Sequence, residues 1–206
     1  MIDLTQYQEM FVRQKVELLE VFTGFETANR YIVSTPEGEQ LLYAYEESGW
    51  LGRQFLKAHR PLALHVIDNE RQTILSASRS FFWFLSHLHV RDGAGRPLGS
   101  LRRQFAFLKR QFVLEDASGN PIAEVQGKLL RPNTFMIYVN GSEVARVTKQ
   151  WSGIMKEAFS DADTFKVQQD PGLDQDFSLM VLATAFAIDL DFFESGGGGA
   201  SFSLGG

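Results

Sequence analysis

The chain has 206 residues, of which 44% are hydrophobic and 22% are charged, and its formal net charge is −5. This length fits one globular domain with a sizeable core, whereas two domains would be cramped. The chain contains no cysteine, which excludes disulfides, thiolate metal sites and S-palmitoyl anchors.

The first fifteen residues, MIDLTQYQEMFVRQK, are acidic and then polar. A secretory signal peptide has basic residues followed by an apolar run, so this segment does not resemble one. We therefore expect a cytoplasmic protein without a signal peptide. Residues Gln8 to Leu19 carry apolar side chains in a mixed pattern, which predicts a short helix running into a strand.

From Arg30 onwards, short apolar stretches alternate with turn residues. Asn140-Gly141 is the strongest hairpin signal, because a two-residue type I′ turn needs positive φ at both positions. Strands at a spacing of roughly 8 to 12 residues, with no amphipathic helix between them, predict an antiparallel sandwich or barrel. The predicted strands are Arg30–Ser34, Gln40–Glu46, Leu62–Asp68, Thr73–Ser78, Phe82–Arg91, Pro97–Leu101, Gln104–Glu115, Ile122–Lys128, Thr134–Val139 and Glu143–Lys149.

Ser178 to Phe193 is the exception, because apolar residues cover every face of the helix that it predicts. A helix that is apolar all round is buried. It is shorter than the ~20 residues of a membrane span and contains Asp189 and Asp191. A helix threaded through a β-barrel satisfies both observations, although the pattern alone leaves closure of the barrel open. The residues predicted to be buried on this helix are Leu179, Leu182, Phe186 and Leu190.

Charge is distributed unevenly along the chain. Between Arg91 and Arg110 six basic residues accompany one acidic residue, and between Glu157 and Glu194 nine acidic residues accompany one basic residue. The basic strip is interpreted either as a site for anionic lipid headgroups or as a solvated sheet face. The acidic overall charge makes nucleic acid a less attractive partner. The basic strip consists of Arg91, Arg96, Arg102, Arg103, Lys109 and Arg110.

The C-terminal part carries a specific series of motifs, WSGIMKEAF followed by DADTF and later by DFFE. In this order they resemble the C-terminal signature of the phospholipid scramblase family. The similarity continues upstream through ELLEVFTGFET at Glu17–Thr27, through Arg60-Pro61-Leu62 and through Ile67-Asp68-Asn69. It covers most of the chain, from about Ile2 to Glu194, and the middle is similar mainly in its pattern.

The resemblance implies a tubby-like fold, which is a closed antiparallel β-barrel of about twelve strands around a central hydrophobic C-terminal helix. We expect this barrel domain over residues 1–194 and a flexible glycine-rich tail over residues 195–206. The implied activity is calcium-linked, bidirectional movement of phospholipids between membrane leaflets. The implied partners are anionic phospholipids or a membrane surface, and the implied location is the inner face of the plasma membrane, with peripheral attachment.

In scramblases, the segment that matches Asp161 to Asp174 is regarded as a calcium-binding loop. Ca²⁺ takes several oxygen ligands, which the carboxylates and amides of this segment offer. The spacing is not that of an EF-hand, since Lys166 stands where glycine is needed. The alternative is a solvated acidic turn in which Asp176 caps the helix. The ligands carried over by the resemblance are Asp161, Asp163, Gln169, Asp170 and Asp174.

Asp189, Asp191 and Glu194 lie near the C-terminal end of the predicted helix, where the helix dipole disfavours negative charge. They need compensation, either from arginines at the barrel rim or from a second calcium ion. His87 and His89 share one side of a strand, which suits a transition metal but lacks a third ligand.

The chain contains no GxSxG, P-loop or HExxH motif and no cysteine nucleophile. We therefore expect no covalent catalysis. Movement of a lipid headgroup across a bilayer makes and breaks no covalent bond. Two further hypotheses stay open beside scrambling, since a fold does not decide function. One is a soluble phosphoinositide- or anionic-lipid-binding scaffold, and the other is a regulatory interaction module.

Overall fold

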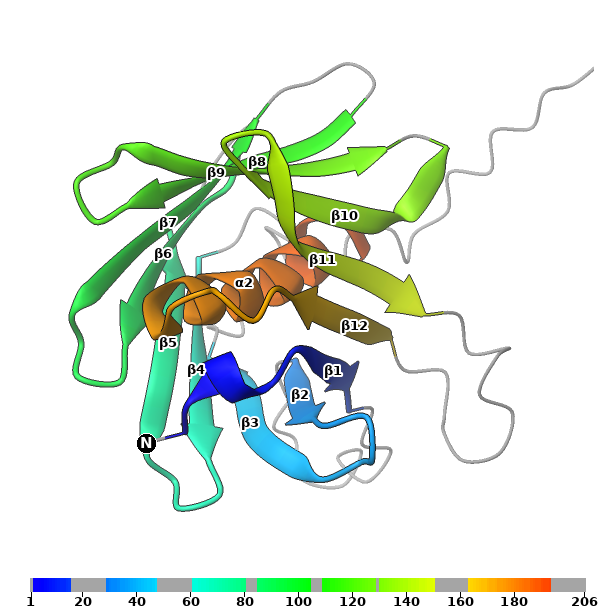
Figure 1. Ribbon diagram of the computed structural model, residues 1–206. Coiled ribbons are helices and arrows are strands. Elements are labelled where there is room, and N and C mark those ends of the chain that lie inside the picture. The colour runs from blue at the N-terminus through cyan, green and yellow to red at the C-terminus, as the bar shows by residue number, and fades with distance from the viewer. Residues whose placement is uncertain are drawn as a thin grey trace, which may run out of the picture.

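The computed structural model describes residues 2–15, 29–47, 61–80, 85–104, 109–128, 130–150 and 163–193. In this part of the chain, twelve antiparallel strands form a closed barrel around one C-terminal helix, α2 (Gln175–Ile188) (Figure 1). The strands follow one another around the barrel in sequence order, and β1 (Glu9–Gln14) closes it by pairing with β12 (Thr164–Gln169). The predicted fold class is confirmed, including the closure that the residue pattern alone left open.

The other elements complete the wall and the two ends of the barrel. A 3₁₀ turn, η1 (Leu4–Gln6), precedes β1, and a π-helical segment, η4 (Asp189–Phe193), continues α2. The remaining strands are β2 (Arg30–Ser34), β3 (Gln40–Glu47), β4 (Leu62–Asp68), β5 (Thr73–Arg79), β6 (His87–Asp92), β7 (Pro97–Gln104), β8 (Lys109–Asp116), β9 (Pro121–Lys128), β10 (Arg131–Val139) and β11 (Ser142–Gln150).

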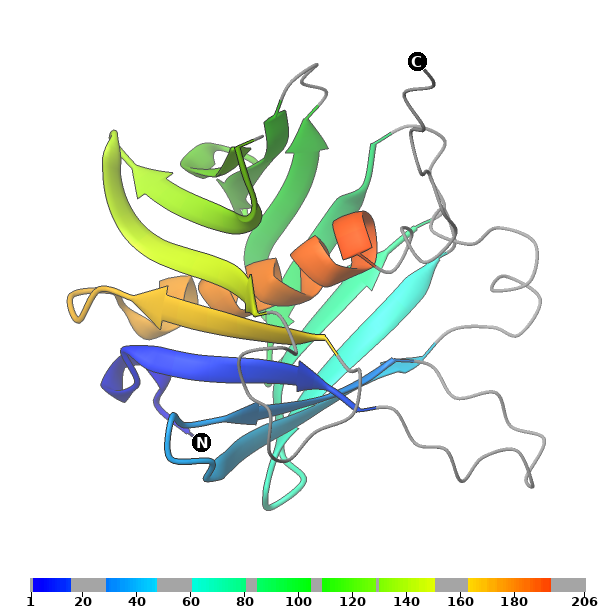
Figure 2. The ribbon, with the colours of Figure 1, turned by 90° about the vertical axis from the view of Figure 1, so that its right-hand side faces the viewer.

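The first and last strands differ from what the sequence suggested. The described part of Gln8 to Leu19 contains no helix and instead forms β1, whose Met10 and Val12 point into the core. β12 occupies a segment in which no strand was predicted, and its Phe165 and Val167 are fully buried. Because a closed barrel leaves no strand edge unpaired, each of these two strands is hydrogen-bonded on both sides. Figure 2 shows them side by side along one wall.

The hairpin turn at Asn140-Gly141 has the predicted conformation. Its φ angles are 50° at Asn140 and 81° at Gly141, as a type I′ turn requires. The turn joins β10 and β11 directly, since Val139 pairs with Ser142. A non-glycine residue at position 141 would have to adopt a strained left-handed conformation.

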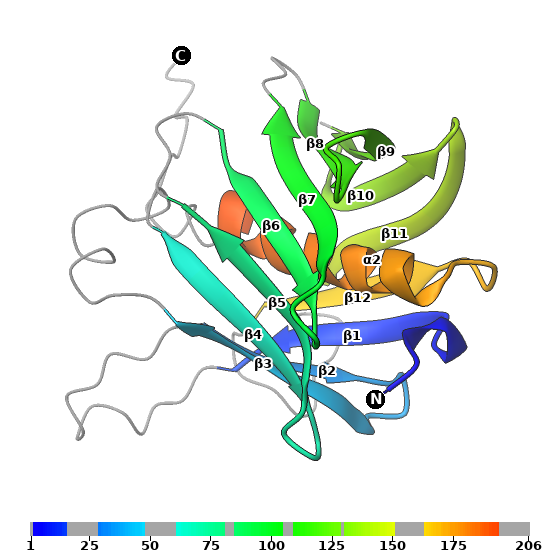
Figure 3. The same cartoon turned by 90° about the vertical axis from the view of Figure 1, so that its left-hand side faces the viewer.

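α2 fills the barrel from one end to the other, and every residue from Ser178 to Ile188 is buried. Figure 3 shows the helix behind the wall formed by β4 to β7. The predicted core residues Leu179, Leu182, Phe186 and Leu190 are at most 2% exposed. Burial of a large apolar side chain contributes about 1.5–3 kcal/mol. Among the described residues, no helix combines the length and the apolar character needed to cross a membrane.

The two ends of the barrel are built differently. We call the end at which α2 begins the N-terminal mouth and the end at which it continues into η4 the C-terminal mouth. The chain's own N-terminal segment covers the N-terminal mouth, where the Gln175 side chain accepts a hydrogen bond from the Leu4 N–H and donates one to the Ile2 carbonyl. Gln169 donates to the carbonyls of Leu4 and Tyr7 at 2.9 Å. These hydrogen bonds hold the N-terminal segment against the end of β12 and the start of α2.

Candidate functional site

Four basic side chains point into the C-terminal mouth. Side chains alternate between the two faces of a strand, and each of these residues is two positions from a buried core residue on its own strand: Ala77, Leu101, Phe112 or Val147. The alternation therefore turns the basic residues inward, where they contact η4 or its neighbours. The four residues are Arg79, Arg103, Arg110 and Lys149.

Arg79 forms a buried ion pair with Asp191. The Nη1–Oδ1 distance is 2.5 Å, and the side chains are 2% and 3% exposed. The Ser86 hydroxyl donates to the other carboxylate oxygen of Asp191. Burial raises the pKa of Asp191, whereas the positive charge of Arg79 opposes that rise. Arg79 thus compensates a carboxylate that the helix dipole disfavours, as the first interpretation of the acidic helix end predicted.

Asp189 is also buried, and its Oδ2 accepts a hydrogen bond of 2.7 Å from the Tyr31 hydroxyl. The Tyr31 ring in turn packs edge-on against Phe186 at 5.1 Å between ring centroids. This contact links β2 to the last turns of α2. Glu194, the third acidic residue of the predicted group, lies outside the described residues.

Arg103 and Arg110 share the ring of Phe192. Their guanidinium carbons lie 4.7 and 5.2 Å from its centroid, a cation–π arrangement. Burial and the nearby charge of Arg103 lower the pKa of Arg110. Within the described residues, no carboxylate forms an ion pair with either arginine. Two partly buried cations that repel each other beside an aromatic ring form a site that favours an anion.

Lys149 extends this site towards β12. Its Nζ lies 4.0 Å from the centroid of Phe193 and 2.6 Å from Oδ2 of Asp163. Phe193 also packs against Phe135 and Phe165. Besides Arg79, which is paired with Asp191, the mouth therefore combines Arg103, Arg110 and Lys149 with the aromatic rings of η4. This arrangement is suited to a ligand with an anionic head and an apolar body.

The predicted basic strip divides between several surfaces. Of its described side chains, Arg103 and Arg110 reach the C-terminal mouth. Arg102 points outward and pairs with Glu115 at 2.7 Å. Arg91 and Arg96 lie at the opposite end of the barrel, where Arg91 donates to the Gly95 carbonyl and Arg96 pairs with Asp92 and Asp176. Lys109 begins β8, and its side chain is outside the described part.

The predicted calcium ligands fall into two groups. Asp163 precedes β12 at the C-terminal mouth and pairs with Lys149. Gln169 and Asp170 follow at the other end of β12, roughly 20 Å away at about 3.3 Å per residue, so one ion cannot contact both groups. Asp174 caps α2 by accepting a hydrogen bond from the Phe177 N–H at 2.7 Å. The remaining predicted ligand, Asp161, lies outside the described residues.

The N-terminal cap of α2 differs from the one that was expected. The sequence suggested Asp176, but the capping side chain is that of Asp174. Asp176 lies in the first turn, where its charge favours the helix dipole, and it forms a bidentate pair with Arg96 at 2.8 and 2.9 Å. Within the part of the chain that the structure describes, no cluster of three acidic or histidine side chains is suited to a metal ion.

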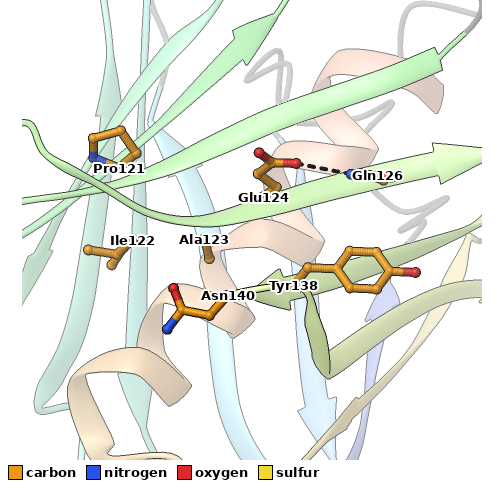
Figure 4. A pocket seen from close by; sticks show the side chains of 8 residues that line it. Pro121, Ile122, Ala123, Glu124, Gln126, Tyr138 and Asn140 are labelled. Atoms are coloured by element: carbon orange, nitrogen blue, oxygen red, sulfur yellow. Dashed lines mark hydrogen bonds between the residues drawn. The ribbon is translucent and has the colours of Figure 1, made fainter.

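Pockets on the outer wall of the described residues include one of about 450 Å³ that is lined by Glu9, Glu143 and Arg146, and two others. The larger of these two others, of about 480 Å³, is lined by β9 and β10, and Glu124 is the only charged side chain that lines it (Figure 4). A smaller pocket of about 190 Å³ adjoins His87 and His89, whose rings lie 4.3 Å apart. The Nε2 atom of His87 is hydrogen-bonded to the Ser100 hydroxyl at 2.9 Å and lies 3.6 Å from Oε2 of Glu115. The smaller pocket also has Arg91, Glu115 and Asp116 in its lining, so it carries both basic and acidic side chains.

Fold and site together define a class of protein, a twelve-stranded barrel closed around a buried helix, with an aromatic and basic mouth. A protein of Arabidopsis thaliana solved by X-ray crystallography has a similar fold, with a TM-score of 0.53, 12% sequence identity, and coverage of 90% of this chain and 96% of that one. The sequence profile of the Scramblase family matches residues 1–195. The chain belongs to the scramblase family.

Individual relatives agree with this assignment. Phospholipid scramblase 1 of Rattus norvegicus is 30% identical over 94% of this chain and 62% of its own length. Phospholipid scramblase 2 of Homo sapiens is 25% identical over 93% of this chain and 69% of its own length. The altered inheritance rate of mitochondria protein 25 of Saccharomyces cerevisiae is 24% identical over 89% of this chain and 70% of its own length. The chain thus spans a little under two thirds of the length of the scramblase 1 relatives.

Proposed function

We propose that this protein binds anionic phospholipid headgroups at the C-terminal mouth and promotes phospholipid movement between leaflets in both directions. The observation that carries the proposal is the pair Arg103 and Arg110, which share the ring of Phe192 and have no ion-paired carboxylate in the described residues. Guanidinium groups bind phosphate through two parallel hydrogen bonds. The proposal concerns phospholipid movement because the chain belongs to the scramblase family.

The phosphate is expected to lie between the two guanidinium groups, with the glycerol and upper acyl atoms against the rings of Phe192 and Phe193. Lys149 adds a third cation at the edge of the site. Each basic residue near a membrane surface contributes about 1 kcal/mol to binding of anionic lipid. The cytoplasmic leaflet is rich in anionic lipids, so the proposal includes peripheral attachment to the inner face of the plasma membrane. No covalent chemistry is required.

The helix does not take part as a membrane span in this proposal. All residues from Ser178 to Ile188 are buried inside the barrel, and exposing each large apolar side chain costs about 1.5–3 kcal/mol. Lipid movement would therefore take place at the mouth and the surface of an intact barrel.

The same burial favours a second candidate function, a scaffold that binds phosphoinositides or other anionic lipids and causes no scrambling. A regulatory interaction module is the remaining alternative.

Calcium linkage is the finer part of the proposal and derives from the family resemblance. Of the ligands proposed from the sequence, Asp163 and Asp170 lie at opposite ends of β12 and cannot bind the same ion. We therefore assign calcium no step in the movement of lipid. A calcium titration of Asp163→Asn and Asp170→Asn tests each end of β12 separately. An unchanged spectral response in both variants would remove these residues as ligands.

The test of the proposed function uses purified protein in liposomes with a leaflet-specific lipid reporter, with and without calcium. The double variant Arg103→Gln/Arg110→Gln removes two charges from the mouth. The matched control is Arg71→Gln/Arg91→Gln, which removes the same charge from exposed positions at the N-terminal mouth. At about 1 kcal/mol per residue, the mouth variant should bind anionic vesicles about 30-fold more weakly.

Three outcomes distinguish the candidate functions. Loss of lipid exchange and of vesicle binding in the mouth variant, with both kept in the control, supports scrambling through the mouth. Vesicle binding without accelerated exchange in the unaltered protein leaves the lipid-binding scaffold. Equal weakening of binding in both variants would show that general surface charge, rather than the paired arginines, attracts the membrane.

A further inference from the structure

The turn between β9 and β10 presents an exposed leucine at the rim of the C-terminal mouth. Leu130 is 95% exposed, whereas the other large hydrophobic residues that stand out at the described surface, Tyr45 and Leu85, are 36% and 39% exposed. A single exposed leucine is ordinary on a soluble protein. Its surroundings, however, are unusual.

Basic residues stand next to one another on three strands at this rim. The register opposes Lys128 of β9 to Lys109 of β8 on one side and to Arg131 of β10 on the other. The register thus places three basic residues in a row on adjacent strands at this rim, and the last of them, the exposed Arg131, directly follows Leu130.

The start of β10, just after the turn, contacts a residue of the C-terminal mouth. The Arg110 guanidinium donates a hydrogen bond of 3.3 Å to the Pro132 carbonyl and faces the rings of Phe192 and Phe193. Arg110 therefore connects the rim of the barrel with the candidate headgroup site. An exposed leucine bordered by cations matches a membrane interface, where the apolar side chain enters the bilayer and the cations remain at the headgroups.

From this arrangement we infer that the β9–β10 turn is the membrane-docking edge of the protein, with Leu130 inserted into an anionic phospholipid bilayer. The inference rests on the proposed function in that both require binding to anionic membranes. It adds an orientation, in which the C-terminal mouth faces the bilayer and the N-terminal mouth faces away. Docking at this edge brings Arg103 and Arg110 close to the headgroups without unfolding of the barrel.

The absence of native cysteine allows a single label to report on depth. Leu130→Cys and Ser118→Cys each receive an environment-sensitive fluorophore, and Ser118 is a matched control because it is exposed in the turn at the opposite end of β9. The probes are phosphatidylcholine vesicles with and without phosphatidylserine. The label at position 130 is expected to shift to shorter wavelength with phosphatidylserine and to be quenched by acyl-chain spin labels. The label at position 118 should do neither.

A second measurement uses unlabelled protein. Leu130→Ser removes the inserted side chain from a fully exposed position, so folding is expected to be unchanged. Because burial of a leucine is worth roughly tenfold to a hundredfold in an equilibrium constant, co-sedimentation with phosphatidylserine vesicles should weaken by at least about tenfold. Added salt should weaken the binding of both proteins, since it screens the basic row.

The outcomes separate this inference from the proposed function. Equal vesicle binding by Leu130→Ser and the unaltered protein, or identical spectra for the two labels, overturns docking at this edge. If Arg103→Gln/Arg110→Gln still weakens binding in that case, the proposed headgroup site stands. An unaltered protein that does not bind phosphatidylserine vesicles overturns both.

Discussion

Replacement of Asp191 by alanine is expected to remove about 4 kcal/mol from the free energy of unfolding. The substitution leaves the Arg79 side chain, which is 2% exposed, without its buried ion pair, and loss of one partner of such a pair costs about 3–5 kcal/mol. Ser86 loses a hydrogen-bond acceptor, which adds about 1 kcal/mol. Removal of a negative charge from the C-terminal end of the helix returns only about 0.5 kcal/mol.

The assay is equilibrium unfolding in urea, monitored by circular dichroism. The expected loss is a large part of the 5–15 kcal/mol that stabilises a typical domain. Asp176→Ala is the matched control, because the Arg96–Asp176 pair is 57% and 49% exposed and exposed pairs contribute at most about 1 kcal/mol. The apolar double variant Arg79→Met/Asp191→Leu should recover most of the loss. A loss below about 1 kcal/mol for Asp191→Ala, equal to that of the control, would refute the reasoning.

Three further predictions concern the core, the outer wall and a turn. Phe186→Ala should lower the free energy of unfolding by about 3–5 kcal/mol because it leaves a cavity inside the barrel; urea unfolding with a loss under 1 kcal/mol would contradict this. Burial raises the pKa of Glu115, but the hydrogen bonds from Arg102 and Ser100 and the charges of Arg102 and His87 together hold that pKa below its usual value. Glu115 therefore contributes stability that is present above its unfolded pKa and is lost as pH falls through the folded pKa. Arg102→Gln should move acid unfolding to higher pH, and coincident acid transitions of the two proteins would count against the pair. Gly141→Ala should cost about 1 kcal/mol because φ is 81° there, whereas Gly172→Ala, where a Cβ meets nothing within 4 Å, should be neutral in thermal unfolding.

The wall of the barrel was largely predictable because its turns have specific chemistry. β2 and β4 begin and end at the predicted residues, and the Asn-Gly pair alone predicted the turn at Asn140-Gly141. β12 was not predicted because only Phe165 and Val167 alternate as apolar residues there, and Lys166 and its neighbours are polar. Its flanking carboxylates also suggested a loop. The buried helix was predictable because it has no polar face.

The candidate site was only half predictable. Arg103 and Arg110 belonged to the predicted basic strip, but nothing local distinguished them from Arg102, which points outward. Strand alternation would have separated inward from outward residues once the barrel was known to close. The contribution of Lys149 and Phe193 depends on contacts between segments that are far apart in sequence. Such convergence is set by tertiary structure rather than by any motif.

The order of the elements along the chain affects how the protein is made. β12 closes the barrel and α2 fills it, and both come after residue 163. A ribosome synthesises the chain from its N-terminus, so the eleven earlier strands emerge before the parts that cover their apolar faces. Until then, those faces are open to aggregation, and nascent chains of this protein should depend on chaperones. Completion of the native fold therefore has to wait until β12 and α2 have been synthesised.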